Sequence, residues 1–359
     1  MFNNKTLIVI GAGASKEAGL PTGYELKQRI ADLLDIRFRF SPLLRIDAPE
    51  PTGDDLIKDA LNEYSRKHNP HSPGDINPYL NAAWRIRDAM PQASSIDTFI
   101  DNHHGDKEIE LCGKLAIARS ILEAEKKSLM YFDKTKDSAN INFSSLVGTW
   151  FESFWHLLIE NCSRDDLPKR LSSLALIVFN YDRCIEHFLY HSLQNYYGLS
   201  EIEAAKIIRN IEIYHPYGKV GHLRWQQDDN SIGFGEEPHP IGLLTLADQI
   251  KTFSEGTDTN SSEVVTIRQK LCEANIIIFL GFAFHQMNLD LLKPTIISSH
   301  DSRSVAYYAT SKGISLSNCD IIKSKLNSLN GKDAKLIEIK NNLTCSQFFH
   351  EYWMSLSLS

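Results

Sequence analysis

The sequence predicts an α/β protein with a Rossmann-like open parallel sheet of about six strands and a large, mainly helical insertion after the first βα unit. Short runs rich in Ile, Leu, Val and Ala are typical of strands buried on both faces of a parallel sheet. These runs lie at residues 7–10, 174–179, 211–214, 276–280, 305–309 and 336–339. Between most of them lie stretches of helical length, as βα units require.

One gap is far longer than a crossover helix, because about 140 residues separate the first βα unit from the second predicted strand. We therefore expect a Rossmann domain at 1–35 and 171–359, with a helical insertion domain at 36–170. Apolar residues recur at helical spacing in two places, and we interpret both stripes as core. They are Leu111, Leu115, Ala118, Leu122 and Leu129, then Phe143, Val147, Trp150, Phe154 and Leu157. Loops are expected at 40–53, 68–78 and 226–240.

The composition argues against two classes of protein, nucleic-acid-binding proteins and membrane proteins. The formal net charge is −7, and no long Lys/Arg run is present, which argues against direct nucleic-acid binding. No segment approaches the roughly 20 apolar residues of a membrane span. The six cysteines are scattered without a CxxC pair, as expected for reduced thiols. Together these features predict a cytoplasmic globular protein without membrane contact.

Ligands bind beyond the carboxyl ends of strands in open parallel sheets, so the residues after each strand are candidates. The first strand is followed by Gly-Ala-Gly-Ala-Ser at 11–15, where small residues let backbone N–H groups approach a diphosphate. Lys16 occupies the position of the third glycine in the dehydrogenase fingerprint, so the match to that motif is poor. The alternative is a purely structural turn.

Polar residues follow the second and third strands. Asn180 and Asp182 share a side of extended chain, so both can face a ligand, although Asp182 is equally suited to capping the next helix. His215 follows the third strand and is a candidate general base. His187 and His191 lie four apart on a helix, but Phe188 stands where a zinc-protease helix carries glutamate, so we expect no metal site.

The order of these motifs resembles the sirtuin family, and more closely the bacterial sirtuin-like proteins of antiphage defence. The resemblance rests on Gly-Ala-Gly-Ala-Ser at 11–15, Ala-Gly-Leu-Pro at 18–21, Asn-Tyr-Asp at 180–182 and His215. Ser-Ile-Asp-Thr-Phe at 95–99 and Leu-Gly-Phe at 280–282 add to it. The paired cysteines of a sirtuin zinc ribbon are missing, which favours water as the acceptor. Tyr217 precedes Gly218 where most relatives place the catalytic histidine, so His215 and Tyr217 both remain candidates for the base.

The resemblance implies an NAD+ hydrolase that cleaves the nicotinamide N-glycosidic bond to give nicotinamide and ADP-ribose, as an antiphage effector that depletes NAD+. Asn180 would orient water and ribose, Asp182 would hold the ribose or stabilise positive charge, and His215 would act as base. The implied NAD+-binding residues are Gly11, Ala12, Gly13, Ala14, Ser15, Gly19, Thr22, Tyr181, Tyr217, Gly281, Phe282, Asn288 and Thr310. Homo-oligomers and a HerA-type ATPase partner are also implied. The alternatives are a non-catalytic NAD+ or ADP-ribose sensor, and a protein deacylase or ADP-ribosyltransferase.

Overall fold

The computed structural model describes residues 4–38, 52–133, 140–226, 231–256, 261–294, 304–329 and 334–358. The chain divides into two compact units, each assembled from separate stretches of sequence. The first, called here the sheet unit, comprises Met1–Leu20, Ser128–Pro216 and Thr257–Ser359. The second, the helical unit, comprises Pro21–Lys127 and Tyr217–Gly256. Most of the loop predicted at 40–53 lies outside the described residues.

The sheet unit contains a six-stranded, entirely parallel sheet with the order β3-β2-β1-β4-β5-β6. Its strands are β1 (Thr6–Ile10), β2 (Leu174–Val178), β3 (Glu212–Tyr214), β4 (Ile276–Leu280), β5 (Val305–Thr310) and β6 (Ala334–Lys340). This strand order is that of doubly wound dinucleotide-binding folds. In such folds the chain adds strands on one side of β1 and then, from β4 on, on the other side, while all strands stay parallel. The predicted α/β class and all six predicted strands are confirmed.

Burial explains why these short runs form strands. Every residue of β1, β2 and β4 is buried, as expected when helices cover both faces of a sheet. β1 pairs with β2 on one side and with β4 on the other over its whole length, so Ile10 stands beside both Val178 and Leu280. Because all strands run the same way, the residues that follow them collect at one edge.

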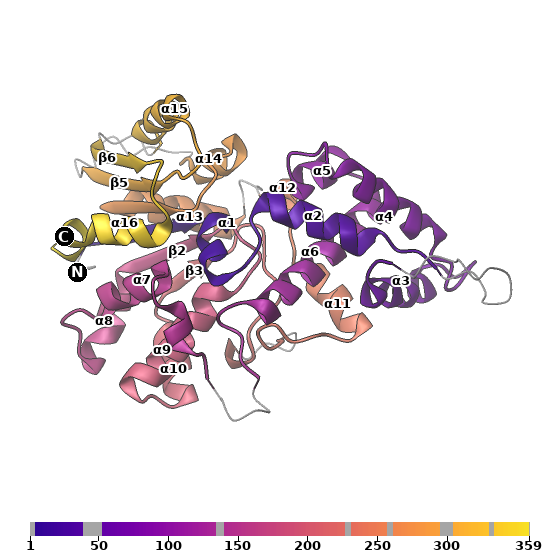
Figure 1. The fold of residues 1–359 in the computed structure, drawn as a ribbon, viewed down its shortest axis with the longest axis horizontal. Helices are drawn as coiled ribbons and strands as arrows, with labels where there is room; N and C mark the ends of the chain where they lie inside the picture. The colour runs from indigo at the N-terminus through magenta and orange to yellow at the C-terminus, as the bar shows by residue number, and fades with distance from the viewer. Residues whose placement is uncertain are drawn as a thin grey trace. The chain divides into compact units, whose positions relative to one another are not determined.

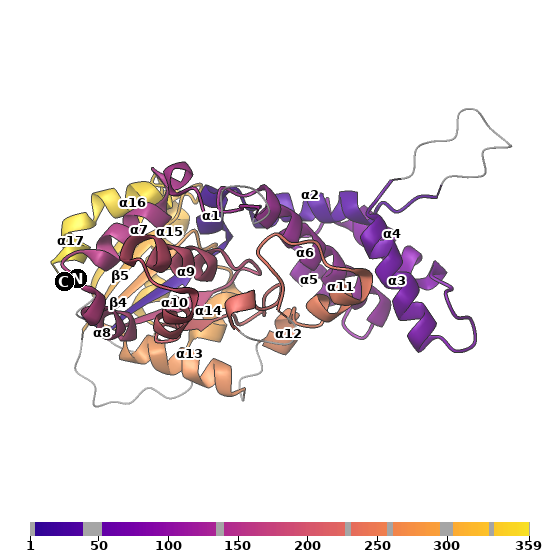
Figure 2. The same ribbon diagram turned by 90° about the horizontal axis from the view of Figure 1, so that it is seen from below.

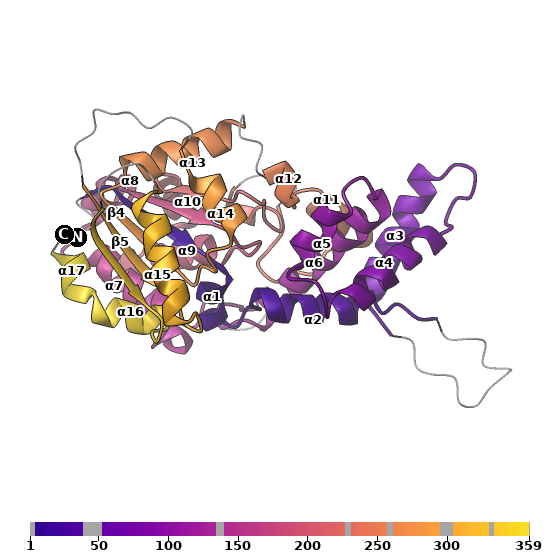
Figure 3. The same cartoon turned by 90° about the horizontal axis from the view of Figure 1, so that it is seen from above.

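Short helices surround the sheet. Those of the sheet unit are α1 (Ala12–Ser15), η1 (Lys16–Ala18), η2 (Phe143–Leu146), α7 (Trp150–Ile159), η3 (Arg164–Asp166), α8 (Leu167–Ser172), α9 (Cys184–Tyr197), α10 (Glu201–Ile208), α13 (Ser262–Glu273), α14 (Gln286–Leu292), α15 (Leu316–Asn327), α16 (Cys345–Glu351) and α17 (Trp353–Ser357). Figures 2 and 3 show α13 on one face of the sheet and α7 with α16 on the other. The sheet is therefore shielded on both faces.

The helical unit is built around α6 (Lys107–Lys127), which is buried on almost every side. Its other elements are α2 (Gly23–Leu34), α3 (Asp55–His68), α4 (Asn77–Ala89), α5 (Ile96–Asn102), η4 (Arg224–Gln226), α11 (Pro240–Ala247) and α12 (Phe253–Gly256). α2, α4 and α11 all pack against α6, and α11 also packs against α3 (Figure 1). Leu115, Ala118 and Leu122 of the predicted stripe are buried, whereas Leu129 lies beyond the helix and is 42% exposed.

The boundaries of these units differ from the predicted domains 1–35, 36–170 and 171–359. The stretch at 128–170 belongs to the sheet unit, where Trp150 of α7 stacks on Phe349 of α16 at a centroid separation of 6.2 Å. The stretch at 217–256 belongs to the helical unit, because its helix α11 packs on α3 and α6. Apolar spacing predicts that a helix is buried, but it does not identify the surface that buries it.

Among the helices of the described segments, none has both the length and the apolar character that a bilayer crossing demands.

Candidate functional site

The glycine turn after β1 interlocks with the turn after β4. Gly11 donates its amide to the Leu280 carbonyl at 2.9 Å, and Gly13 donates to the Gly281 carbonyl at 3.0 Å. A Cβ at Gly281 would lie 2.0 Å from the Ala14 nitrogen, and one at Gly11 would lie 2.5 Å from the Gly281 carbonyl oxygen. The glycines at these positions are thus required for backbone packing within the protein. The amides of Gly11 and Gly13 are already used there.

The turn after β1 is also hydrogen-bonded to the segment after β2. The Asn180 side-chain amide donates to the Ser15 hydroxyl at 2.9 Å, although 165 positions separate the two residues. Both are buried, with exposed fractions of 3% for Ser15 and 7% for Asn180. Two of the segments singled out in the sequence therefore meet at the carboxyl edge of the sheet.

The third segment joins through His215. Its ring nitrogen Nδ1 lies 3.2 Å from the Asn180 backbone carbonyl, and Nε2 lies 2.9 Å from a carboxylate oxygen of Glu186 on α9. His215 is 7% exposed and Glu186 is 1% exposed. Since a carbonyl oxygen can only accept, this contact is a hydrogen bond when Nδ1 carries a proton. The Glu186 carboxylate likewise accepts only from a protonated Nε2, so a neutral imidazole, which carries one proton, can donate to one of these two acceptors and not to both.

Asp182 lies in the same buried cluster. The pKa of its carboxyl group is raised, chiefly by burial and further by the nearby charge of Glu186. Hydrogen bonds with Ser15 and Cys184 oppose this shift but do not cancel it. The Cys184 amide donates to Asp182 Oδ1 at 3.0 Å. The N-cap of α9 is Arg183 and not the predicted Asp182, which lies one residue earlier. Asp182 is therefore held in place by both Ser15 and Cys184.

Residues after β4 and β5 complete this edge. The Gly281 amide donates to the Thr310 hydroxyl at 2.8 Å, which ties the two turns together. Phe282 is buried in an aromatic cluster with Phe179, at a centroid distance of 5.1 Å, and with Phe284, at 5.2 Å. Thr310 and Phe282 thus have structural contacts that account for their positions.

The remaining predicted residues have local roles or belong to the helical unit. Gly19 ends η1 with φ at +96°, and Ala12 and Ala14 belong to α1. Tyr181 is buried beside Asn180, and Asn288 is half-buried on α14. Thr22 and Tyr217 belong to the helical unit. There Thr22 caps α2 in a reciprocal pair with Glu25, and burial raises the pKa of Tyr217 above its already basic value.

Three contributors are missing from the prediction. Glu186 contacts His215, and the Trp150 indole donates to the Ala14 carbonyl at 2.9 Å. Glu17 accepts from the backbone amides of Trp150, at 2.7 Å, and Ser346, at 3.0 Å, at the starts of α7 and α16. The sequence holds a signal only for Glu186, which is a carboxylate inside an otherwise apolar or aromatic stretch of helix and so requires a buried partner.

The cluster offers defined chemistry at the edge where parallel sheets bind ligands. It combines an amide, a hydroxyl, an imidazole and two carboxyl groups within one hydrogen-bonded chain. Across the described part of the chain, no group of three or more His, Cys, Asp or Glu side chains is arranged to hold a metal ion. The arrangement can orient a polar ligand and move a proton at His215.

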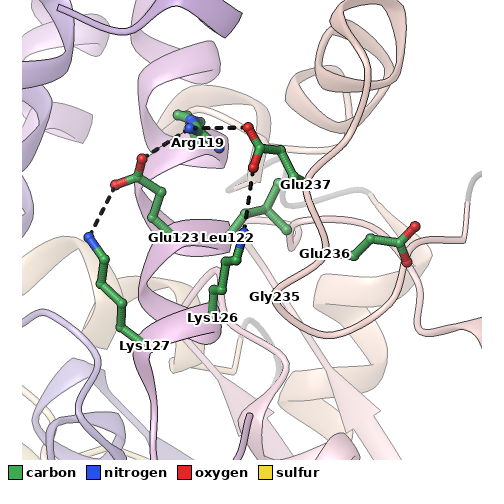
Figure 4. Close-up of a pocket in the computed structure, with 8 residues that line it drawn as sticks. All are labelled: Arg119, Leu122, Glu123, Lys126, Lys127, Gly235, Glu236 and Glu237. Carbon is green, nitrogen blue, oxygen red and sulfur yellow. Dashed lines mark ion pairs between the residues drawn. The ribbon is translucent and has the colours of Figure 1, made fainter. Parts of the chain in front are cut away.

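A separate pocket of about 220 Å³ lies within the helical unit, between α6 and the segment before α11. Figure 4 shows Glu123 between Lys127 and Arg119, and Glu237 between Arg119 and Lys126. The separations in these ion pairs are 3.1 to 3.8 Å. Because the charges alternate and compensate one another, the pocket has no net preference for an anion or a cation.

Comparison with known proteins finds no match for this chain, either to a protein-family model or to a curated protein.

Proposed function

We propose that the protein is an NAD+ hydrolase that cleaves the nicotinamide N-glycosidic bond and releases nicotinamide and ADP-ribose. The observation that carries this proposal is the hydrogen-bonded meeting of Ser15, Asn180 and His215 at the carboxyl edge of the sheet. The strand order of dinucleotide-binding folds supports it, since such folds bind their ligand at that edge. The sirtuin-like order of motifs supports it further.

In this proposal the nicotinamide ribose lies against Asn180, Asp182 and His215. Asn180 orients the attacking water, and the carboxyl group of Asp182 holds the ribose or offsets positive charge as nicotinamide leaves. His215 accepts a proton from a ribose hydroxyl. For this step Nδ1 must carry a lone pair and face the substrate hydroxyl, while Nε2 keeps its proton and its contact with Glu186.

The diphosphate would lie over the turn at 11–15. Since Gly11 and Gly13 donate to β4 and its turn, their amides are not the donors in this proposal. The Ser15 hydroxyl also has protein partners, the side chains of Asn180 and Asp182. Glycine at these positions then serves the binding edge indirectly, by holding the turn in place.

Nicotinamide release from NAD+ by the purified chain tests the proposal directly. Asn180→Ala should lower turnover by 100-fold or more, an estimate of about 3 kcal/mol in the barrier. Tyr190→Phe is the matched control, because Tyr190 is buried on α9 of the same unit and is not among the residues proposed to bind NAD+. If Asn180→Ala and the native chain release nicotinamide at the same rate, Asn180 has no part in the reaction.

The same assay separates the two alternatives. Stoichiometric NAD+ or ADP-ribose binding without turnover would favour a sensor. Transfer of label from NAD+ to protein, or loss of an acyl group from an acetylated peptide, faster than free ADP-ribose accumulates would favour a transferase or deacylase. Assays over a range of protein concentrations, with and without a HerA-type ATPase, test the proposed oligomer and partner.

A further inference from the structure

We infer that Glu186 is a positioning residue for His215: it keeps the histidine proton on Nε2 and thereby makes Nδ1 the atom that accepts a proton. Nε2 lies 2.9 Å from Glu186 Oε1, whereas Nδ1 lies 3.2 Å from the Asn180 carbonyl oxygen. The shorter contact joins the imidazole to a carboxylate, and a hydrogen bond to an ionised group is roughly twice as strong as a neutral one.

Of the two ring nitrogens of His215, Nδ1 can give up its protein contact more readily than Nε2. Glu186 is 1% exposed and lies on α9, which is buried over most of its length, so its carboxylate is fixed in place by the helix. The Asn180 carbonyl belongs to the turn between β2 and α9, where the proposed substrate would lie. An incoming hydroxyl can replace the longer contact at Nδ1, while the contact at Nε2 remains inside the protein.

These two contacts determine which tautomer the neutral His215 ring adopts. The hydrogen bond at one ring nitrogen determines whether the other carries a proton or a lone pair. With the carboxylate of Glu186 accepting at Nε2, the neutral ring has its lone pair at Nδ1. The same logic orients the histidine of hydrolytic triads through a buried carboxylate. Glu186 would therefore act through His215 without touching the substrate.

Glu186→Gln is the decisive variant, because glutamine keeps the size of the side chain and can donate an N–H to Nε2. The neutral His215 then carries its proton on Nδ1, where the Asn180 carbonyl accepts it, so the variant should fold but have the wrong tautomer. Glu203→Gln is the control, since Glu203 lies on α10 of the same unit and is half exposed.

The first measurement is nitrogen NMR of histidine-labelled protein, with the His215 signals identified by their loss in His215→Gln. We expect a proton bonded to Nε2 in the native chain and in Glu203→Gln, and a proton on Nδ1 but not on Nε2 in Glu186→Gln. Identical His215 signals in the native chain and Glu186→Gln would overturn the inference. This measurement requires no turnover, so it remains valid if the proposed NAD+ hydrolysis fails.

The second measurement rests on the proposed function. Glu186→Gln should lower kcat for nicotinamide release by about 100-fold with little change in KM, the size expected when a catalytic group is misplaced. The pH profile of kcat should also change shape, because the ionisation of the base is altered. A rise in KM at unchanged kcat and an unchanged pH profile would instead show that Glu186 only supports the fold.

Discussion

The sheet unit and the helical unit differ in how their charged side chains are partnered. In the helical unit, buried Asp54 accepts a hydrogen bond from Arg119 at 2.8 Å, and buried Lys114 lies 2.9 Å from the exposed carboxylate of Glu255. Burial raises the pKa of Glu255, but hydrogen bonds from Thr252 and Lys114 outweigh it and the net shift is downward. The ionised form of Glu255 is therefore stabilised. These charges help to hold the unit together.

In the sheet unit, Asp182 shows the opposite behaviour. Burial raises its pKa, and the negative charge of Glu186 adds to that effect against the hydrogen bonds from Ser15 and Cys184. A carboxyl group kept under such conditions is destabilised in its charged form, which is common at ligand-binding and catalytic sites. The comparison teaches that the two settings differ in the neighbouring charge: Asp54 and Glu255 lie beside cations, whereas Asp182 is buried near another carboxyl group.

The largest expected effect concerns the backbone contact that supports this edge. Gly281→Ala should destabilise the sheet unit by about 3 kcal/mol or more, because it combines left-handed strain with a clash. Gly281 has φ at +56°, and its Cβ would lie 2.0 Å from the Ala14 nitrogen. Urea denaturation provides the measurement.

Gly313→Ala is the matched control, since Gly313 has φ at +85° but no atom within 4 Å of an added Cβ. It should cost only the strain, about 1 kcal/mol. Equal losses in the two variants would mean that the interlock of the turns after β1 and β4 contributes nothing.

The next effect tests the paired charges of the helical unit. Arg119→Met should cost about 2 to 3 kcal/mol, because it leaves the carboxylate of Asp54 buried without its partner. Asp54 is 9% exposed and also accepts from the Ile57 amide at the start of α3. Thermal or urea unfolding of the variant measures the loss.

Arg224→Met gives the comparison for an exposed pair in the same unit. Arg224 and Glu236 lie 2.6 Å apart, but their side chains are 62% and 42% exposed. Water screens such a pair, so the loss should stay below about 1 kcal/mol. A loss as large as that of Arg119→Met would show that burial does not govern these pairs.

The two units also differ in how far the sequence predicts them. Continuous apolar runs such as 276–280 predict strands well, because burial on both faces leaves one conformational choice. Parallel strands then bring their ends to one edge, which is why Ser15, Asn180 and His215 could be placed together from the sequence. Their roles in the proposed reaction stay predictions.

Long-range packing could not be predicted in the same way. The spacing of Trp150 and Phe154 predicts an apolar stripe but does not reveal that its partner is Phe349. Likewise, α11 gives no local signal that it packs with α6. The contact between Glu186 and His215 was missed because it joins a helix to a later strand end, and a single sequence does not show which side chains meet across 29 positions.

A smaller effect tests the support of the glycine turn by α7. Trp150→Phe keeps most of the ring packing but removes the indole N–H that donates to the Ala14 carbonyl at 2.9 Å. We expect a loss of about 1 kcal/mol in the free energy of unfolding, the typical contribution of one buried hydrogen bond. Trp155→Phe is the control on the same helix, because the Trp155 ring packs edge-on against Phe188 and Tyr196. Similar losses in both variants would assign the effect to ring size and not to the hydrogen bond.

The smallest effect has the opposite sign and tests the cost of the site itself. Asp182→Asn keeps an oxygen that can accept from Cys184 but removes the buried charge. Because the folded-state pKa of Asp182 is raised, the folded chain holds its proton after the unfolded chain has lost it, so stability falls as pH rises above about 4. The variant lacks this loss and should be more stable than the native chain by on the order of 1 kcal/mol at neutral pH, with the difference vanishing near pH 3.

Asp166→Asn should show the reverse trend, because hydrogen bonds from Ser163 lower the pKa of that exposed carboxyl group. Urea denaturation across this pH range measures the free energy of unfolding of both variants. If the native chain instead gains stability relative to Asp182→Asn as pH rises, the Asp182 charge is favourably solvated. The contrast between the two units would then be false.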